Sequence, residues 1–214
     1  MPLPLLFIEF ASLEGTLSMI ARFVALVLGL SCLTAVVWLG PAQAEKFNLE
    51  ETVELCASCH GEAGLPEDRA IPIIWGQTWY YIYVQLRDYK AGRRSNEIMS
   101  EIVKPFKKQD FQDLATYFSE KKWPTTSITV DEVAARKGEE HAVAGQCSQC
   151  HSTYKGDSRV PRLAGQLPNY LVKTMLDFKK KVRLNSPAKG SLMASFSDHD
   201  VEAIAAYLAN LDVP

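Results

Sequence analysis

Two short segments of the chain carry residues whose types and spacing could do chemistry. Each has two cysteines three positions apart and a histidine directly after the second; they are Cys56-Ala57-Ser58-Cys59-His60 and Cys147-Ser148-Gln149-Cys150-His151. Three residues are close to one helical turn, so the two thiols of a pair face the same side of a helix. Thiols placed in this way can add across the two vinyl groups of haem, and the following histidine then binds the iron. The pattern is the attachment motif of c-type haem.

Other uses of this spacing explain the chain less well. A single copy also suits half of a zinc site or a redox-active dithiol, and four cysteines in an exported chain suggest a disulfide framework. A tetrahedral zinc site would have to take cysteine and histidine from both copies at once. A thioredoxin-like dithiol needs a βαβ pattern, which the sequence lacks. Two complete copies, with no further cysteine after residue 44, therefore predict two covalently bound haem c groups.

The N-terminus has the pattern of an export signal. Residues 23–39 contain no charged side chain, Arg22 precedes them, and Ala42-Gln43-Ala44 follows. A positive start, an apolar stretch and a small-residue site are typical of a secretory signal peptide. We therefore expect residues 1–44 to be a signal peptide, cleaved after Ala44, and the protein to work in the periplasm. An uncleaved anchor is the alternative, because the apolar run is long for a signal peptide.

The beginning of the chain and its composition add two limits. Residues 1–18 lie unusually far upstream, and Met19 would make a more usual start, so residues 1–18 are a candidate mis-assigned beginning. With 47% hydrophobic and 22% charged residues and a formal net charge of −2, the chain has the composition of a soluble folded protein. It gives no case for nucleic-acid binding.

The sequence around the two motifs repeats. A proline, a Gly-Gln pair and a tyrosine recur at a constant offset of 89, as Pro72, Gly76, Gln77 and Tyr81 and then as Pro161, Gly165, Gln166 and Tyr170. A later set recurs at an offset of 90: Phe106, Asp110, Leu114 and Tyr117 match Phe196, Asp200, Ile204 and Tyr207. Internal repetition of this kind predicts two copies of one haem domain, at residues 45–124 and 125–214. The linker is expected at residues 123–127, where proline and small polar residues end a helix.

A methionine after each motif is the candidate sixth ligand of each iron. Met99 stands 39 residues past His60, and Met193 stands 42 past His151. Both are expected in irregular segments, which favours iron binding over core filling, the ordinary use of methionine. A third residue, Met175, aligns with Leu86 on a predicted helix and is expected in the core. His/Met ligation keeps iron low-spin and leaves no open position for catalysis.

Proline carbonyls are the candidate supports of the two histidines. An imidazole that binds metal usually donates its other N–H to a carbonyl or carboxylate. In a domain of this type the acceptor is expected to be the carbonyl of a proline that follows the motif, and the matching positions are Pro72 and Pro161. Both prolines also shape extended loops.

The local patterns predict an all-helical protein. Thr129-Val130-Asp131-Glu132 resembles a capping box at the start of a helix that runs towards Cys147. Pro168 suits the first turn of a helix through about Lys181, and Ser197 begins the last helix. In the first half, helices are predicted over residues 78–92, with Thr78 as cap, and over residues 110–121. No stretch alternates like a strand next to a hairpin turn.

Taken together, these motifs resemble the cytochrome c4 family. Each half has C-x-x-C-H, then P-x-x-x-G-Q with a tyrosine, then a distal methionine, and the resemblance covers roughly residues 45–214. The cytochrome subunit of flavocytochrome c sulfide dehydrogenase is similar. The resemblance implies two tandem class I cytochrome c domains, each wrapped around one covalent haem. It implies the ligands His60 and Met99 for one haem and His151 and Met193 for the other.

The resemblance also implies an electron carrier rather than an enzyme. Expected partners are redox proteins: a quinol-oxidising complex, a dehydrogenase or flavoprotein subunit, and a terminal oxidase or photosynthetic centre. The alternative is the haem subunit of a flavin-dependent sulfide dehydrogenase. Association with a membrane is expected only through an uncleaved signal or a partner. Catalysis at a haem, such as peroxidase chemistry, would need an open iron position, and the two methionines argue against it.

Charge gives a further indication of how partners bind. Acidic side chains lie near the first motif, and the run Lys179-Lys180-Lys181 with Arg183 lies in the second half. These charges are explained if each group simply forms a face that is exposed to solvent. The alternative is that the basic run docks an acidic redox partner and the acidic face a basic one.

Overall fold

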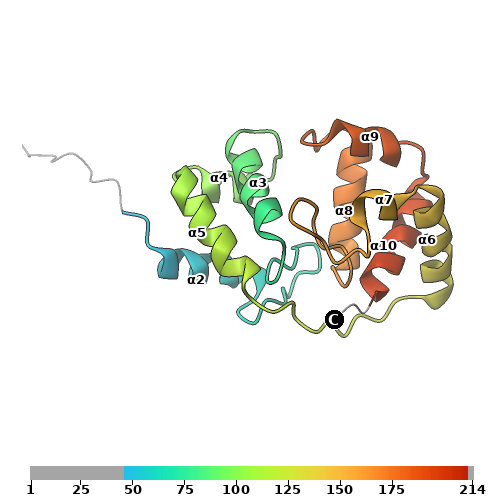
Figure 1. The fold of residues 1–214 in the computed structure, drawn as a ribbon, viewed down its shortest axis with the longest axis horizontal. Coiled ribbons are helices and arrows are strands. Elements are labelled where there is room, and N and C mark those ends of the chain that lie inside the picture. The colour runs from blue at the N-terminus through green and yellow to red at the C-terminus, as the bar shows by residue number, and fades with distance from the viewer. Residues whose placement is uncertain (1–45, 212–214) are drawn as a thin grey trace, which may run out of the picture. The chain divides into compact units, whose positions relative to one another are not determined.

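The computed structural model describes residues 46–211, so the predicted signal peptide lies outside the described residues. Within that range the chain is helical and has no strand, as predicted. Helices α2 to α5 gather in one group and α6 to α10 in another (Figure 1). Their bounds are α2 Leu49–His60, α3 Trp79–Lys90, α4 Glu97–Val103, α5 Lys108–Ser119, α6 Glu132–Ala144, α7 Cys147–His151, α8 Pro168–Lys179, α9 Pro187–Met193 and α10 Asp198–Asn210. None of these helices is long and apolar enough to cross a membrane.

The first group of helices, α2 to α5, packs around its own small core. Ile82 of α3 meets Leu114, Ala115 and Phe118 of α5, and all four side chains are buried. Rings and aliphatic side chains from α2 and the connecting loops surround them. This cluster of four buried side chains is small, and a large cavity, described with the site below, lies beside it.

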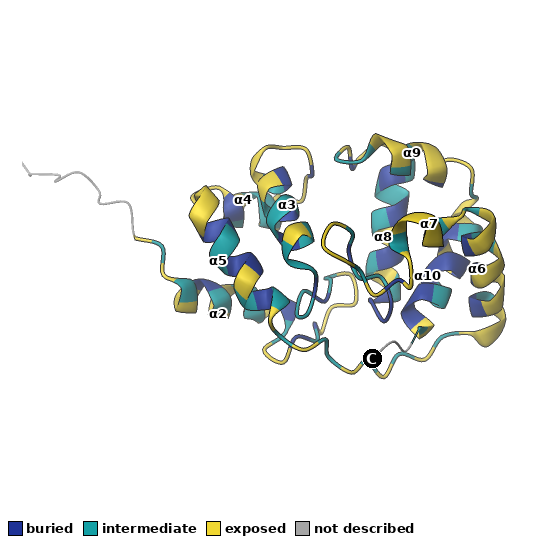
Figure 2. Ribbon diagram, in the orientation of Figure 1, coloured by how far each residue is buried: buried dark blue, intermediate teal, exposed yellow. Residues whose placement is uncertain are grey.

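The second group, α6 to α10, has a larger core built on the last helix. Val201, Ile204, Ala205 and Leu208, the face of α10 expected to be apolar, are all buried. Helix α6 crosses α10 so closely that a Cβ on Gly138 would lie 1.9 Å from the carbonyl oxygen of Ala203. The outer side of α6 faces solvent (Figure 2). A glycine is therefore required at position 138, because no side chain fits between the two backbones.

The structure corrects the expected start of α6. Thr129 was the expected cap, but Asp131 occupies that position and its carboxylate accepts hydrogen bonds from the N–H groups of Val133 and Ala134. A carboxylate also interacts favourably with the positive end of the helix dipole, which a threonine hydroxyl does less well. The predicted last helix is correct: Ser197 caps α10, and Asp200 accepts from the Ser197 N–H to complete a capping box.

The two methionines do not lie in irregular segments, as expected, but on short helices. Asn96 caps α4 by accepting a hydrogen bond from the N–H of Met99 itself. Pro187 stands in the first turn of α9, which ends at Met193. Each methionine is thus carried by about two turns of helix, which fix its position better than a loop would.

Two glutamines join the group α2–α5 to the group α6–α10. The side chain of Gln77 accepts from the N–H of Arg162 at 2.7 Å and donates to its carbonyl at 3.0 Å. In the same way, Gln166 accepts from the N–H of Ile73 at 2.9 Å and donates to its carbonyl at 2.9 Å. Gln77 and Gln166, like Ile73 and Arg162, are 89 positions apart. Residues related by the sequence repeat therefore make matching contacts across the interface.

Candidate haem sites

The first motif lies at the end of a long helix. Cys56, Cys59 and His60 occupy the last two turns of α2, and Nδ1 of His60 lies 2.8 Å from the carbonyl oxygen of Pro72. Gly61 ends the helix at a φ of +88°, and its N–H donates to the carbonyl of Ala57. A Cβ at that position would meet the Leu65 carbonyl oxygen at 2.3 Å, so the chain can turn away under the histidine only with glycine.

A cavity of about 360 Å³ opens beside this motif. Cys56, Cys59 and His60 line it together with Met99. Apolar side chains from α3 and α5 form part of the wall, among them Ile82, Leu86, Leu114 and Phe118, and polar and charged side chains from both halves form the rest. The cavity thus brings the histidine and the predicted methionine of one site to the same space. The apolar part of the wall would hold the porphyrin ring, and the two thiols would bind its vinyl groups. The residues present fit a covalently bound haem.

The electrostatics of the first site suit a metal ligand. Burial lowers the pKa of His60; the hydrogen bond to Pro72 acts in the opposite direction, and the nearby charge of Arg94 lowers it further. The imidazole is therefore neutral near pH 7 and keeps a lone pair for iron. Burial, with a smaller contribution from Cys59, raises the pKa of Cys56 to about 11, so this thiol stays protonated in the absence of haem.

The second motif is held in a different way. Cys147, Cys150 and His151 lie on α7, a single turn that is set off from α6 by Gln146 at a φ of 53°. Ser152 and Tyr154, at φ values of 48° and 63°, follow the motif in place of a glycine. Non-glycine residues rarely adopt such angles, and each costs on the order of 1 kcal/mol or more.

The histidine of the second motif, His151, also lacks the well-formed hydrogen bond that His60 makes with Pro72. Its Nδ1 is buried and has no hydrogen-bond partner among the described residues, although the nearby Pro161 carbonyl raises its pKa. Burial and the charge of Lys189 outweigh that effect and lower the pKa of His151 to about 4. The Pro72 carbonyl therefore makes a well-formed hydrogen bond with its histidine, whereas the Pro161 carbonyl lies near His151 without one. An orphaned ring N–H next to a carbonyl fits a ligand that completes its geometry when iron is bound.

Both methionines of the second half are buried. Met193 is 7% exposed and Met175 is 9% exposed, and they belong to one core cluster against which Cys147 packs. Met175 lies within α8, facing Leu171 and Phe178 of the same cluster, as its alignment with Leu86 predicts.

The four cysteines of the two motifs are all free thiols, so they form no disulfide framework. Cys59 and Cys150, the second cysteine of each motif, are exposed, whereas Cys56 and Cys147 are partly buried. Among residues 46–211, no three side chains of the His, Cys, Asp and Glu types gather in a way that could hold a metal ion. The two motifs therefore do not combine into one zinc-type site in this part of the chain.

Two buried arginines at the interface are candidate functional residues that the motif search missed. Arg94 and Arg183 are 9% and 6% exposed, and both line the cavity of the first site. Each reaches a tyrosine of the other half: Arg94 donates to the hydroxyl of Tyr170 at 3.0 Å, and Arg183 to that of Tyr81 at 3.2 Å. Both also donate to Gln85. The signal was present in the sequence, since the arginines share the offset of 89 with Tyr81 and Tyr170.

Neither arginine has a carboxylate partner among the described ion pairs. Asp88, the nearest acid of this network, is taken by Arg93 at 2.7 Å and by Asn185 at 2.7 Å. The two guanidinium charges lower the pKa of the buried Tyr81 to about 8, so the region is strongly positive. Buried charges without a counterion are costly. Haem carries two propionates, which would supply the missing negative charges at this end of the cavity.

Known proteins share this arrangement. The protein-family model "Cytochrome C oxidase, cbb3-type, subunit III" matches residues 133–208. Cytochrome c4 of Thiocapsa roseopersicina is 33% identical over 175 residues, which cover 73% of this chain and 87% of the relative. The chain belongs to the cytochrome c4 family. The crystal structure of reduced recombinant cytochrome c4 from Pseudomonas stutzeri matches with a TM-score of 0.69 at 28% identity, covering 78% of this chain and 100% of the other.

Two further relatives are named after the enzymes they serve. The thiosulfate dehydrogenase electron acceptor of Stutzerimonas stutzeri is 29% identical and covers 73% of this chain and 78% of its own length. The cytochrome subunit of sulfide dehydrogenase from Chlorobaculum tepidum is 35% identical over 63 residues, 29% of this chain and 56% of its own. As a cytochrome c4, the protein carries two haem c groups and transfers electrons between redox partners; it is an electron carrier.

Proposed function

We propose that this cytochrome c4 is a periplasmic shuttle with two His/Met-ligated haems. It accepts electrons from a quinol-oxidising complex or a dehydrogenase and passes them to a terminal oxidase or photosynthetic centre. The observation that carries the proposal is the cavity in which His60 and Met99 meet beside the two thiols of the first motif. In the second half, His151 and Met193 take the same roles, and Cys147 and Cys150 hold the haem.

The residues around the ligands support transfer rather than catalysis. Iron bound by histidine and methionine has no open position for a substrate, and methionine raises the reduction potential. Pro72 orients the imidazole of His60 through its carbonyl, and Pro161 takes the same role for His151 once iron is bound. Arg94 and Arg183 receive the propionates and keep positive charge near both haems. The two halves, residues 45–124 and 125–214, each enclose one haem, and residues 1–44 direct export and are removed after Ala44.

Replacement of the methionines tests the ligand assignment. Purified protein from an exporting host should contain two haems per chain by pyridine haemochrome assay and show the weak absorption band of methionine-bound ferric haem. Met99→Ala and Met193→Ala should each remove half of this band and lower the potential of one haem by on the order of 0.1 V. Met175→Ala is the matched control, because a core methionine should affect stability but not the band. Loss of the band in Met175→Ala instead of Met193→Ala would reverse the assignment in the second half.

The second candidate is the haem subunit of a flavin-dependent sulfide dehydrogenase. The 63-residue match to the Chlorobaculum tepidum subunit favours it. The free shuttle should purify from its native host without flavin, whereas a fixed subunit should bring a flavoprotein in a constant ratio through successive columns. Size-exclusion chromatography with absorbance read at flavin and haem wavelengths separates the two.

A further inference from the structure

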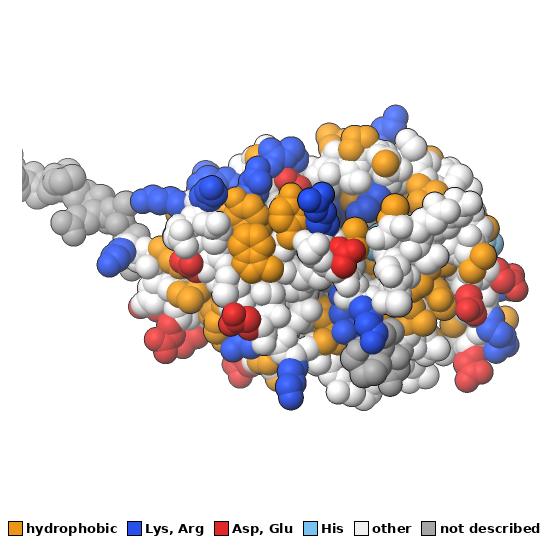
Figure 3. Space-filling view, in the orientation of Figure 1, with side chains coloured by type: hydrophobic (Ala, Val, Ile, Leu, Met, Phe, Trp, Pro, Cys, Tyr) orange, Lys and Arg blue, Asp and Glu red, His pale blue; other side chains and the backbone are white. Residues whose placement is uncertain are grey.

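The first half has a basic hollow whose lining residues are separate from those of the haem cavity. A hollow of about 550 Å³ lies between α3, the loop after it and the start of α5. Five cationic side chains line it: Arg87, Lys90, Arg93, Lys107 and Lys108. Lys and Arg side chains gather over this part of the surface (Figure 3). Aromatic rings, those of Tyr83, Phe106 and Phe111, also line the hollow.

Few of these cations are neutralised within the protein. Arg93 pairs with Asp88 at 2.7 Å, and Arg87 lies over the ring of Tyr83 at 5.4 Å. Lys107 and Lys108 take part in none of the ion pairs of residues 46–211. Several like charges around one concave surface repel one another and attract an anionic ligand.

The second half has the same arrangement of helices without most of these positive charges, so the fold does not require them. At the offsets of 89 and 90, Leu176, Val182, Ser197 and Asp198 stand where the first half has Arg87, Arg93, Lys107 and Lys108. The remaining cation has a structural role in both halves, since Lys90 donates to the Phe106 carbonyl and Lys179 to the Phe196 carbonyl. Lys179 also has a carboxylate partner, Asp198, at 2.6 Å. The same corner is therefore neutralised in one half and strongly basic in the other.

We infer that the basic hollow is a docking site for an acidic segment of a protein that exchanges electrons with this cytochrome. This inference rests on the proposed role as a carrier between proteins. The hollow is much larger than a single inorganic anion, and its concave shape and aromatic lining suit a peptide segment better than a flat lipid surface. Helix α3 separates the hollow from the haem cavity: Tyr83 and Arg87 face the first, and Ile82 and Leu86 the second. A partner held there lies one helix away from the haem.

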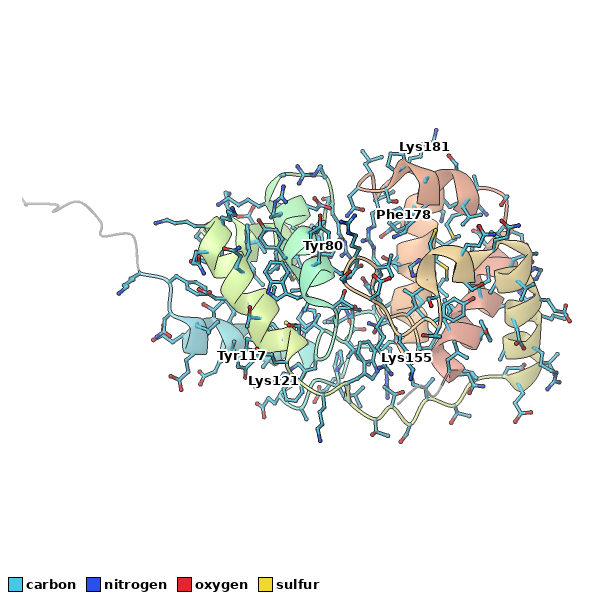
Figure 4. All side chains as sticks on the ribbon, in the orientation of Figure 1. Tyr80, Tyr117, Lys121, Lys155, Phe178 and Lys181 are labelled. Atoms are coloured by element: carbon cyan, nitrogen blue, oxygen red, sulfur yellow. The ribbon has the colours of Figure 1, made fainter. Side chains whose placement is uncertain are left out.

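The structure shows how much of the basic run Lys179-Lys180-Lys181 with Arg183 is exposed. Lys179 is bound to Asp198 and to the Phe196 carbonyl, and Arg183 is buried at the interface. Only Lys180 and Lys181 of that run are exposed. Lys181 lies in the second half, on the turn after α8 (Figure 4). This pair of lysines provides a control for the charge of the hollow.

The test uses an eight-residue oligoglutamate peptide, labelled with a fluorophore, and the purified holo-cytochrome at low ionic strength. The hollow variant is Lys107→Ser with Lys108→Asp, which copies the Ser197-Asp198 start of α10 and leaves Asp110 to complete the cap. The control is Lys180→Ser with Lys181→Asp, which makes the same change of three charge units elsewhere. The hollow variant should weaken peptide binding about tenfold and the control by less than about twofold, and salt should abolish binding.

Equal weakening in both variants would show a response to net charge and overturn the proposal. Binding to phosphatidylglycerol vesicles with loss in the hollow variant, but no binding of the peptide, would overturn it in favour of a membrane surface. Haem content and reduction potentials are measured on each protein before the binding experiment. Normal values with no peptide binding would refute the docking site alone, whereas abnormal values in the unchanged protein would refute the proposed electron-carrier function.

Discussion

The two halves of this cytochrome solve the same problem with different local structures. In the first, a twelve-residue helix carries the motif, a glycine ends it, and a proline carbonyl holds the histidine. In the second, a five-residue helix carries the motif, and Gln146, Ser152 and Tyr154 adopt left-handed angles around it. The buried Nδ1 of His151 has no hydrogen-bond partner within residues 46–211. The two halves therefore share the C-x-x-C-H motif, but the backbone that carries it differs, and the first half holds its histidine more firmly.

The strongest test of this difference between the two halves is to exchange the residues that follow the motifs. Gly61→Ser should lower the free energy of unfolding by about 3 kcal/mol, because the side chain meets Leu65 and the backbone angle is strained. Ser152→Gly should raise it by about 1 kcal/mol, because glycine accepts the φ of 48° freely. Thermal unfolding of the holo-proteins, followed by circular dichroism, measures both. A destabilised Ser152→Gly would show that the second turn is not strained.

The two interface glutamines offer the next largest effect. Gln166→Ala leaves the N–H and carbonyl of Ile73 without partners in a fully buried place and should cost about 2 kcal/mol. Gln77→Ala removes the matching pair of hydrogen bonds to Arg162 in a partly buried place, where water can substitute, and should cost about 1 kcal/mol. Chemical denaturation of the two holo-variants measures the two losses in free energy of unfolding and so gives their ratio. Equal losses of stability would indicate that water is excluded to the same degree from both ends of the interface.

The smallest expected effect concerns the two interface arginines. Arg94→Met and Arg183→Met remove a buried cation near the haems and should lower reduction potentials by about 60 mV, which corresponds to about 1.4 kcal/mol for one electron. Because each arginine reaches across the interface, either variant should shift both haems. Spectroelectrochemical titration with haem-resolved NMR signals measures this, and Arg94→Lys should recover part of the loss. A shift confined to the haem of the mutated half would show that the halves are electrostatically independent.

The sequence by itself determined the chemistry of this protein. The spacing of Cys56, Cys59 and His60, and its repetition 91 residues later, follows from the geometry of haem attachment, which is local to one helical turn. The last helix and its cap were also predictable, since Ser197 and Asp200 act within four residues of each other. The start of α6 was harder to predict, because Thr129 and Asp131 can both cap a helix. In the structure the Asp131 carboxylate caps α6.

Only the tertiary structure decided how the two halves meet. The repeat of Gln77 and Gln166 was visible in the sequence, but their partners lie 85 and 93 residues away, and no local rule connects them. The burial of Arg94 and Arg183 and the ion pair of Lys179 with Asp198 are likewise results of long-range packing. Ligand type follows from covalent spacing along the chain, whereas the environment of each haem follows from side chains that only folding brings together.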